Sequence, residues 1–164
     1  MTTYILGIDP GLTGALALID TKTQALVTFS VPTWVVKKKT CFDGQTLAFW
    51  LSAYYGQIKH AYVEQVTSRP RQAGQLLIGL NAGILHGLLY ANGTPFTVVT
   101  PAAWKFYFAL KRLENETYRD KKNDSRALAA ELFPAHAKAF ARVKDDGVAE
   151  ASLIALYGLN QGST

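Results

Sequence analysis

The sequence predicts an α/β domain with a mixed five-stranded sheet, three antiparallel strands followed by two parallel ones, and helices on both faces. Three short apolar segments near the N-terminus are separated only by turns, which predicts consecutive antiparallel strands. A strand, a long helix and a further strand follow, an order that makes the last strands parallel. With 164 residues, the chain is expected to form a single domain, residues 1–164, that buries about two thirds of its unfolded surface.

The first strand and its turn are predicted over residues 1–15. Tyr4 to Ile8 is apolar, and Asp9 places a carboxylate where burial should end. Pro10, Gly11 and Gly14 supply a tight turn, after which a second strand runs to Ile19. Two interpretations of Asp9 stay open: it only closes an Asx-turn, or it binds a metal in a cleft.

The next elements are predicted from periodicity. Residues 24–31 form a third strand, and the Lys- and Thr-rich segment 32–43 is a loop able to contact a backbone phosphate. Residues 44–55 are expected to form a helix on the sheet. Residues 60–65 form a short strand with Glu64 at its exit.

A polar segment, residues 67–74, leads into a long helix that ends at Asn92 and Gly93. The helix carries Gly79, Gly83 and Gly87, which recur every four residues. Because each glycine costs roughly 1 kcal/mol of helix propensity relative to alanine, we expect another backbone to approach there, from the sheet or from a second copy of the chain. An apolar stripe is predicted at helical spacing: Leu77, Leu80, Ile84, Leu88 and Ala91.

The second half continues with a buried strand, residues 95–100, and a short helix opened by Pro101. Residues 113–123 are expected to be an exposed connection and residues 125–133 a helix. The last helix begins at Asp145 and Asp146. Asp146 and Glu150 lie four residues apart on one side of it, so something positive should compensate them; the alternative is a capping aspartate followed by a solvated glutamate.

Charge and composition narrow the function. The chain carries a net charge of +5, with 49% apolar and 18% charged residues, which is globular composition. A polyanionic partner and a merely solvated basic surface are both compatible with its basic clusters. These clusters are Lys37, Lys38 and Lys39; Arg69 and Arg71; Lys105, Lys111 and Arg112; and Arg119, Lys121, Lys122 and Arg126.

The single cysteine, Cys41, allows no internal disulfide and no thiolate metal site. No signal-like segment and no run of about eighteen apolar residues is present. We therefore expect a soluble intracellular protein without membrane attachment.

Four carboxylates from three distant segments could converge on one cleft. Asp9 and Glu64 end neighbouring strands, and the helix bearing Asp146 and Glu150 could cover that edge. Such a cluster is electrostatically costly without cations, and hard oxygen ligands favour Mg²⁺ or Mn²⁺ over Zn²⁺. Two such ions about 4 Å apart can activate a water molecule and stabilise the leaving oxygen of a phosphodiester.

The sequence also resembles RuvC-type Holliday-junction resolvases of the ribonuclease H-like superfamily, above all the shorter phage-borne members. The resemblance rests on Ile5 to Gly11 with Gly14, Val63 to Gln65, Gly83 to Leu85 with Pro95, Pro101 to Lys105, and Ala149 to Ala151. It implies a ribonuclease H-like fold, a homodimer, and symmetric nicking of four-way DNA junctions with a divalent metal. The implied location is the cytoplasm of a bacterial or phage-infected cell, with an organelle as the alternative.

Within this resemblance, Asp9 and Glu64 match the first two metal-binding acids. Glu150 matches the acid of the family's Ala-Asp-Ala motif, with Glu in place of Asp. The remaining acid normally stands three residues earlier, where this chain has Gly147. Its substitutes here are Asp146 and, behind it, Asp145.

The resemblance also assigns basic residues near the site. Lys105 matches the lysine after the Pro-containing stretch, and Lys121 or Lys122 matches the second one; both would neutralise phosphate or transition-state charge. Many family members carry an aromatic wedge after the strand-end glutamate, but residues 66–72 hold none. The residues expected to make the central DNA contacts instead are Arg69, Arg71 and Gln72.

Two other classes of function stay open. The first is a nuclease for other branched DNA, single-stranded DNA or RNA/DNA hybrids, because the carboxylates fix the chemistry and not the shape of the substrate. The second is a non-catalytic junction-binding protein of the same fold, or an ATP-handling protein of the actin-like group. The chain is too short for two actin-like lobes and lacks a second Gly-rich phosphate turn.

Overall fold

The computed structural model describes residues 2–67, 74–110 and 118–162, with only the backbone described for 118–122. Its central sheet has the strand order β3-β2-β1-β6-β7, which confirms the predicted five-stranded mixed sheet. The strands are β1 (Tyr4–Asp9), β2 (Ala15–Asp20), β3 (Leu26–Ser30), β6 (Ile58–Glu64) and β7 (Phe96–Val99).

The register of these strands fixes which ends meet. β2 pairs antiparallel with both β1 and β3, and Asp9 lies opposite Ala15. β6 runs parallel to β1, with Val63 beside Ile8, and β7 runs parallel to β6. The carboxyl ends of β1 and β6 therefore lie side by side, each followed by a polar turn or loop.

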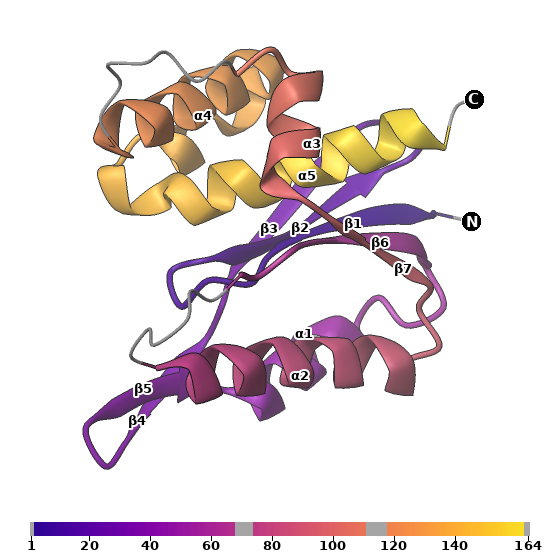
Figure 1. The fold of residues 1–164 in the computed structure, drawn as a ribbon. Helices are drawn as coiled ribbons and strands as arrows, with labels where there is room; N and C mark the ends of the chain where they lie inside the picture. Colours follow the sequence, from indigo (N-terminus) through magenta and orange to yellow (C-terminus); the bar gives the residue numbers. More distant parts are fainter. Residues whose placement is uncertain (1, 68–73, 111–117, 163–164) are drawn as a thin grey trace.

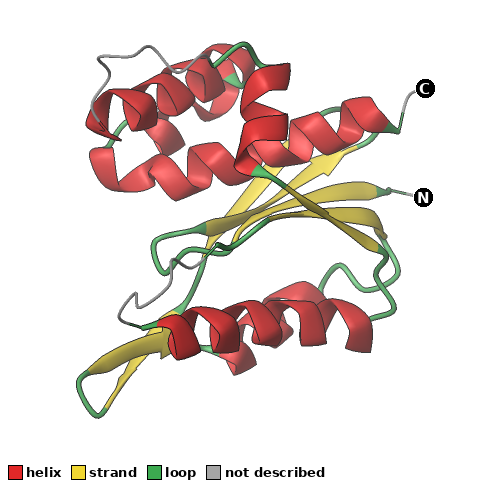
Figure 2. Ribbon diagram, in the orientation of Figure 1, coloured by secondary structure: helices red, strands yellow, loops and turns green. Residues whose placement is uncertain are grey.

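Helices cover both faces of the sheet (Figures 1 and 2). One face carries α1 (Gly44–Ser52) and α2 (Gln75–Ala91). The other face carries α3 (Pro101–Tyr107), α4 (Tyr118–Leu132) and α5 (Asp146–Gln161), with 3₁₀ turns at Pro134–Phe140 and Val143–Asp145 leading into α5. Each face has its own apolar core, and the central strands β1 and β2 are buried on both sides.

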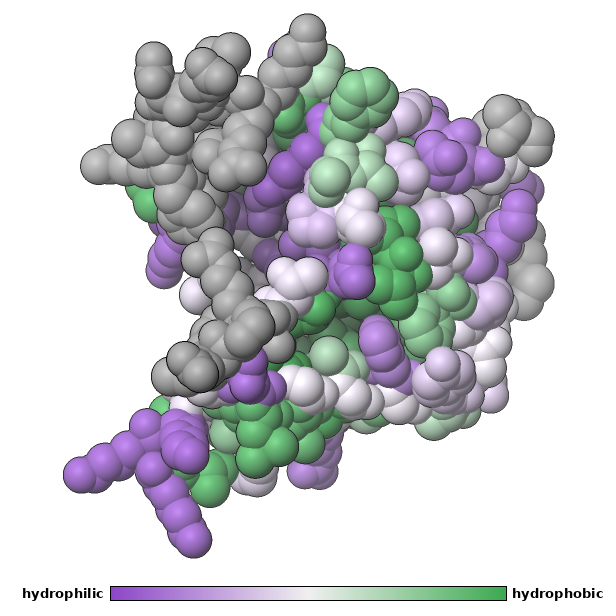
Figure 3. All heavy atoms as spheres, in the orientation of Figure 1, coloured by the Kyte–Doolittle hydropathy of each residue, from purple (hydrophilic) through white to green (hydrophobic). Residues whose placement is uncertain are grey.

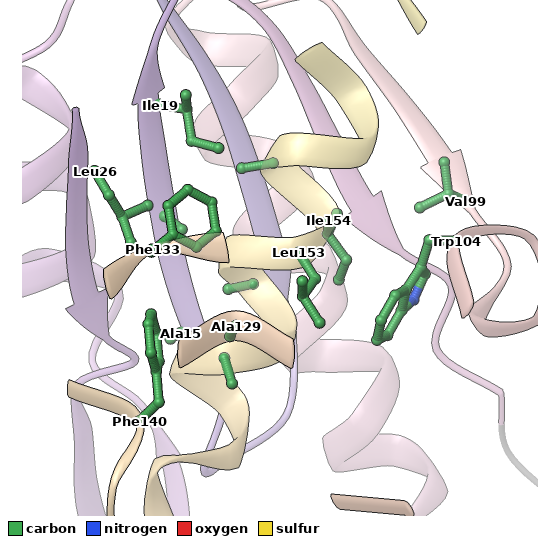
Figure 4. Packing of buried hydrophobic residues seen from close by; sticks show 14 residues of the cluster. Ala15, Ile19, Leu26, Val99, Trp104, Ala129, Phe133, Phe140, Leu153 and Ile154 are labelled. Atoms are coloured by element: carbon green, nitrogen blue, oxygen red, sulfur yellow. The ribbon is translucent and has the colours of Figure 1, made fainter. Parts of the chain in front are cut away.

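α5 lies against β1 at backbone contact distance. A Cβ atom at Gly7 would stand 2.3 Å from Ala151 O and 2.3 Å from Ala155 N. Figure 4 shows the core on this side, with Leu153 and Ile154 of α5 facing the cluster that also contains Trp104. The alanines of α5 and the glycine of β1 are thus what let the helix approach the sheet.

The segment predicted as a loop over residues 32–43 is a hairpin instead. β4 (Thr33–Val36) pairs antiparallel with β5 (Lys39–Phe42), and the two form a separate two-stranded sheet. β-branched and aromatic residues favour strands, and this preference prevails over the lysines that suggested a loop.

Two further predictions on helices are corrected. α4 begins at Tyr118, so residues 118–123 belong to a helix and not to the predicted connection. In α2 the fully buried residues are Asn81, Leu85 and Leu89, whereas Leu80 of the predicted stripe is 54% exposed. The buried Asn81 Oδ1 accepts a hydrogen bond from Phe42 N at 3.4 Å, which satisfies this polar group inside the core. Among the described residues no helix is long and apolar enough to cross a membrane.

Candidate active site

Asp9 is held at the tip of β1 by the turn that follows it. Gly11 N donates a hydrogen bond to Asp9 Oδ1 at 3.0 Å, and Gly14 N donates to Gly11 O at 2.9 Å. The first contact is the Asx-turn bond of the simpler interpretation. It also fixes the direction of the carboxylate, as a metal ligand would require, so the turn is compatible with both interpretations.

The N-terminus of α5 rests on this same turn. A Cβ atom at Gly147 would lie 2.2 Å from Thr13 O and 2.7 Å from Gly14 Cα, so no side chain fits at position 147. This contact gives a physical reason for the absence of an acid three residues before Glu150. Asp146, one residue earlier and only 4% exposed, shares the side of the helix on which Glu150 lies.

Asp145 is engaged elsewhere. Arg142 Nη2 lies 2.9 Å from Asp145 Oδ1, and Arg142 N donates to Asp145 Oδ2 at 3.0 Å. The hydrogen bonds from Arg142 hold the pKa of the Asp145 carboxyl below its usual range. Asp145 therefore closes the 3₁₀ turn before α5, which favours Asp146 as the fourth acid of the site.

Glu64 and Glu150 are held by residues of α3. Trp104 Nε1 donates a 2.7 Å hydrogen bond to Glu64 Oε2, and Lys105 Nζ lies 3.1 Å from Glu150 Oε1. Ser125 Oγ lies 3.5 Å from the same Glu150 oxygen. Sequence reasoning missed the Trp104 contact, since it joins residues forty positions apart; its one signal is the place of Trp104 beside Lys105.

The charges of Glu64 and Glu150 affect each other, and residues of α3 balance them in part. Burial raises the pKa of Glu64, and the nearby charge of Glu150 raises it further, while the Trp104 hydrogen bond and Lys105 act in the opposite direction. The Glu150 side chain is 13% exposed and that of Lys105 34%. Two acids that share a largely buried position need positive charge, and here Lys105 supplies it.

The structure brings the predicted acids to one end of the sheet without closing them into a cage. Asp9 and Glu64 end neighbouring parallel strands, and Asp146 and Glu150 lie on the helix turn packed against the 11–14 turn. Among the described residues, no three His, Cys, Asp or Glu side chains form a group that could hold a metal ion. The donor set of oxygen atoms nevertheless fits Mg²⁺ or Mn²⁺ chemically.

Several predicted DNA-contacting residues lie outside the described residues. Arg69, Arg71 and Gln72 belong to segment 68–73, and the side chains of Lys121 and Lys122 are not described. Lys105 is described: it contacts Glu150, and its Nζ lies 4.8 Å from the centre of the Trp104 ring. Its position beside the carboxylates agrees with the place predicted for it.

Together, the strand order and the helices on both faces define a ribonuclease H-like fold. The chain is similar in structure to Thermus thermophilus RuvC in complex with a Holliday junction substrate, with a TM-score of 0.59 and 15% identity, over 98% of this chain and 96% of that one. A second T. thermophilus RuvC structure gives a TM-score of 0.49 and 17% identity, over 98% and 97% of the two chains. No family model and no curated protein sequence matches the chain. The predicted resemblance to RuvC is thus confirmed for the fold.

Proposed function

We propose that this protein is a structure-selective DNA endonuclease that resolves four-way junctions by divalent-metal-dependent phosphodiester hydrolysis. The observation that carries the proposal is the partly buried pair of Glu64 and Glu150, held by Trp104 and Lys105 at the strand ends where Asp9 also lies. The fold supports it, since a RuvC structure of the same fold was solved with a Holliday junction substrate. The net charge of +5 suits a polyanionic substrate.

The residues that would hold the metal are Asp9, Glu64, Asp146 and Glu150. Two Mg²⁺ ions, or Mn²⁺ in their place, supply activation of a water molecule and stabilisation of the leaving oxygen when bound. The chain itself contributes orientation: Trp104 fixes the Glu64 carboxylate and Gly11 N fixes that of Asp9. Lys105, together with Lys122, would neutralise charge on the phosphate.

DNA binding is proposed for basic residues around this end of the sheet. Lys105 lies at this end of the sheet, with its Nζ 3.1 Å from Glu150 Oε1. An anionic DNA phosphate can compete with Glu150 for this ammonium group. The other residues proposed to contact the DNA are Arg69, Arg71, Gln72, Lys121 and Lys122.

We propose a homodimer that forms through α2. A Cβ atom added at Gly79, Gly83 or Gly87 would meet nothing within 4 Å among the described residues, so the interpretation in which these glycines pack closely on their own sheet is wrong. Exposed apolar residues continue their face of the helix: Leu76 at 88%, Leu80 at 54% and Tyr90 at 72%. A second copy of the chain would remove this apolar stripe from water.

Light scattering tests the dimer. It should give twice the chain mass for the wild type and the chain mass for Leu80→Arg. A monomeric wild type contradicts the dimer.

Cleavage of synthetic substrates tests the function. Four-way junctions, flaps, linear duplex and RNA/DNA hybrids are compared with Mg²⁺ and with EDTA. Preferential, symmetric, Mg²⁺-dependent cutting of the four-way junction supports the proposal. Preference for flaps or hybrids moves the protein to the alternative nuclease class, and junction binding without cutting of any substrate identifies a non-catalytic binder.

Variants of the acids test the site. Asp9→Asn should lower the cleavage rate at least about 100-fold while junction binding stays near that of the wild type, because loss of even a residue that supports a metal ligand costs 10–100-fold. Asp146→Asn should behave likewise, whereas Asp145→Asn, its matched neighbour, should keep cleavage. Full Mg²⁺-dependent cleavage by Asp9→Asn would rule out the assigned site.

A further inference from the structure

The hairpin β4–β5 exposes an aromatic and basic surface that the active site does not use. Its large apolar side chains face solvent: Trp34 is 59% exposed and Val35 is 70% exposed. Lys37, Lys38 and Lys39 follow and are all exposed. Residues 31–42 contain no acidic residue, so nothing within the hairpin neutralises these three charges.

The tip of the hairpin keeps lysines where the backbone favours other residues. Lys37 has φ 46° and Lys38 φ 65°, the left-handed pair of conformations of a two-residue hairpin turn. Asn-Gly is the preferred sequence in such turns, because an ordinary side chain in a left-handed conformation costs about 1 kcal/mol or more. The turn therefore keeps two exposed positive charges at the tip of the hairpin, at a cost in local stability.

The base of the hairpin is anchored at the active-site end of the sheet. β3 ends at Ser30, which pairs with Ala15, and Val31 N donates to Gly14 O at 3.0 Å, in the turn that follows Asp9. At the other side, Asp43 N donates to Pro32 O at 2.8 Å. The hairpin thus starts beside the Asp9 turn and projects past the α1 and α2 layer (Figure 1). In Figure 3 hydrophilic side chains extend from this corner into open space.

We propose that the β4–β5 hairpin is a DNA-binding arm. Lys37, Lys38 and Lys39 contact backbone phosphates, and Trp34 stacks on a base that is unpaired beside the junction. This inference rests on the proposed function and names a part of the substrate-binding surface. The charge of the hairpin indicates that its partner is a nucleic acid. Three adjacent lysines with no acid between them are complementary to the phosphates of a DNA backbone. Proteins that bind single strands combine such positive charge with exposed aromatic side chains on which bases stack.

The charge is tested with a variant that leaves the turn intact. Lys37→Asn with Lys38→Gly removes two charges and installs the sequence that the turn prefers. Its matched control, Lys22→Asn with Lys59→Gln, removes two exposed lysines at the opposite end of the sheet, beside the start of β1. Affinity for a four-way junction is measured by fluorescence anisotropy in EDTA between about 50 and 200 mM salt. Melting curves confirm that both variants are folded.

The hairpin variant should bind the junction about tenfold more weakly, and the slope of log affinity against log salt should fall by roughly 1 to 2, about one for each phosphate that the variant no longer neutralises. The control should keep the slope of the wild type. Equal slopes for the hairpin variant and the wild type would overturn the proposal, as would an equal loss of affinity in the control. Cleavage is measured in parallel: a wild type that fails to cut, with a hairpin variant that still binds more weakly, refutes the proposed function and supports the arm.

Trp34 is tested by its fluorescence. Of the three tryptophans, Trp104 is fully buried and Trp50 is half-buried and stacked on Phe29 at 4.8 Å, so Trp34 should dominate any quenching by DNA. Trp34→Phe should abolish most of the quenching and keep the affinity, whereas Trp34→Ala should weaken binding about tenfold. Unchanged binding by Trp34→Ala overturns the stacking role. Loss of dimer in light scattering, with unchanged DNA binding, would assign the surface to a second copy instead.

Discussion

Helices α5 and α2 lie on opposite faces of one sheet, and both carry glycines, but the glycines serve different purposes. On the α5 side, Gly147 meets the turn after β1, and Gly7 of β1 meets α5, at distances that leave no room for a Cβ atom. On α2, a Cβ atom added at Gly79, Gly83 or Gly87 would meet no described atom within 4 Å. One face is a closed backbone contact that positions the acids, and the other is a surface open to a partner.

The strongest test of the closed face is Gly7→Ala. Its Cβ would stand 2.3 Å from two backbone atoms of α5, which cannot move as a side-chain tip can. We expect a loss of about 3 kcal/mol or more in the free energy of unfolding, the upper end of the cost of overpacking. Urea denaturation measures it. A loss below about 1 kcal/mol would show that α5 shifts easily to make room for the methyl group, so that the contact between α5 and β1 is not closed.

On the same face, Trp104→Phe removes the N–H that orients Glu64, together with one ring of the indole, and keeps a six-membered aromatic ring in the core. Because loss of a group that orients a metal ligand costs 10–100-fold, we expect the Mg²⁺ concentration for half-maximal cleavage to rise by about that factor. A Mg²⁺ titration of the cleavage rate measures it. An unchanged Mg²⁺ requirement with a lower melting temperature would mean that Trp104 serves packing alone.

The buried charge of this face predicts a pH-dependent effect of Glu64→Gln. The folded-state pKa of Glu64 is raised by burial, so the folded chain holds this proton more tightly than the unfolded chain, and ionised Glu64 destabilises the fold above that pKa. In EDTA at neutral pH the glutamine variant should therefore melt higher than the wild type, by about 2–4 °C per kcal/mol relieved. The difference should shrink as pH falls toward 4.5, the ordinary value. A lower melting temperature at neutral pH contradicts the prediction.

The open face predicts the smallest effect, and one of opposite sign. In the Leu80→Arg background, expected to be monomeric, Gly83→Ala should stabilise the chain by about 0.5–1 kcal/mol, since alanine is the better helix former and nothing blocks its Cβ. Urea denaturation is the measurement here as well. In the wild-type background the same change should weaken the dimer. Destabilisation of the monomer would show that this face is covered after all.

Local signals allowed much of the fold to be predicted. Apolar runs and turn residues place all five strands of the main sheet within about two residues, and the parallel pair follows from the long helix between its strands. The hairpin was missed because three lysines obscured a β-branched run. The glycine spacing of α2 predicted close packing, but which face of a helix meets the sheet depends on the whole fold, and α2 buries Asn81 instead.

The sequence allowed the strands and the helix that carry the candidate site to be predicted, but not the individual contacts between its side chains. Asp9, Glu64 and Glu150 could be proposed from strand ends and one helix motif. The Trp104 contact could not, because it depends on a tertiary approach between residues forty positions apart. Neither could our proposal of Asp146 rather than Asp145 as the fourth acid, which rests on the pairing of Arg142 with Asp145 and on the lack of space at Gly147.

The contact between Gly147 and Thr13 also limits how this protein can evolve. Moving the proposed fourth acid from position 146 to 147 would require a side chain whose Cβ atom lies 2.2 Å from Thr13 O. A substitution at 147 alone would push the Asp9 turn and the first turn of α5 apart, and would separate the acids that they carry. The position of the proposed fourth acid and the shape of the 11–14 turn therefore constrain each other, and an acid at position 147 requires a different turn.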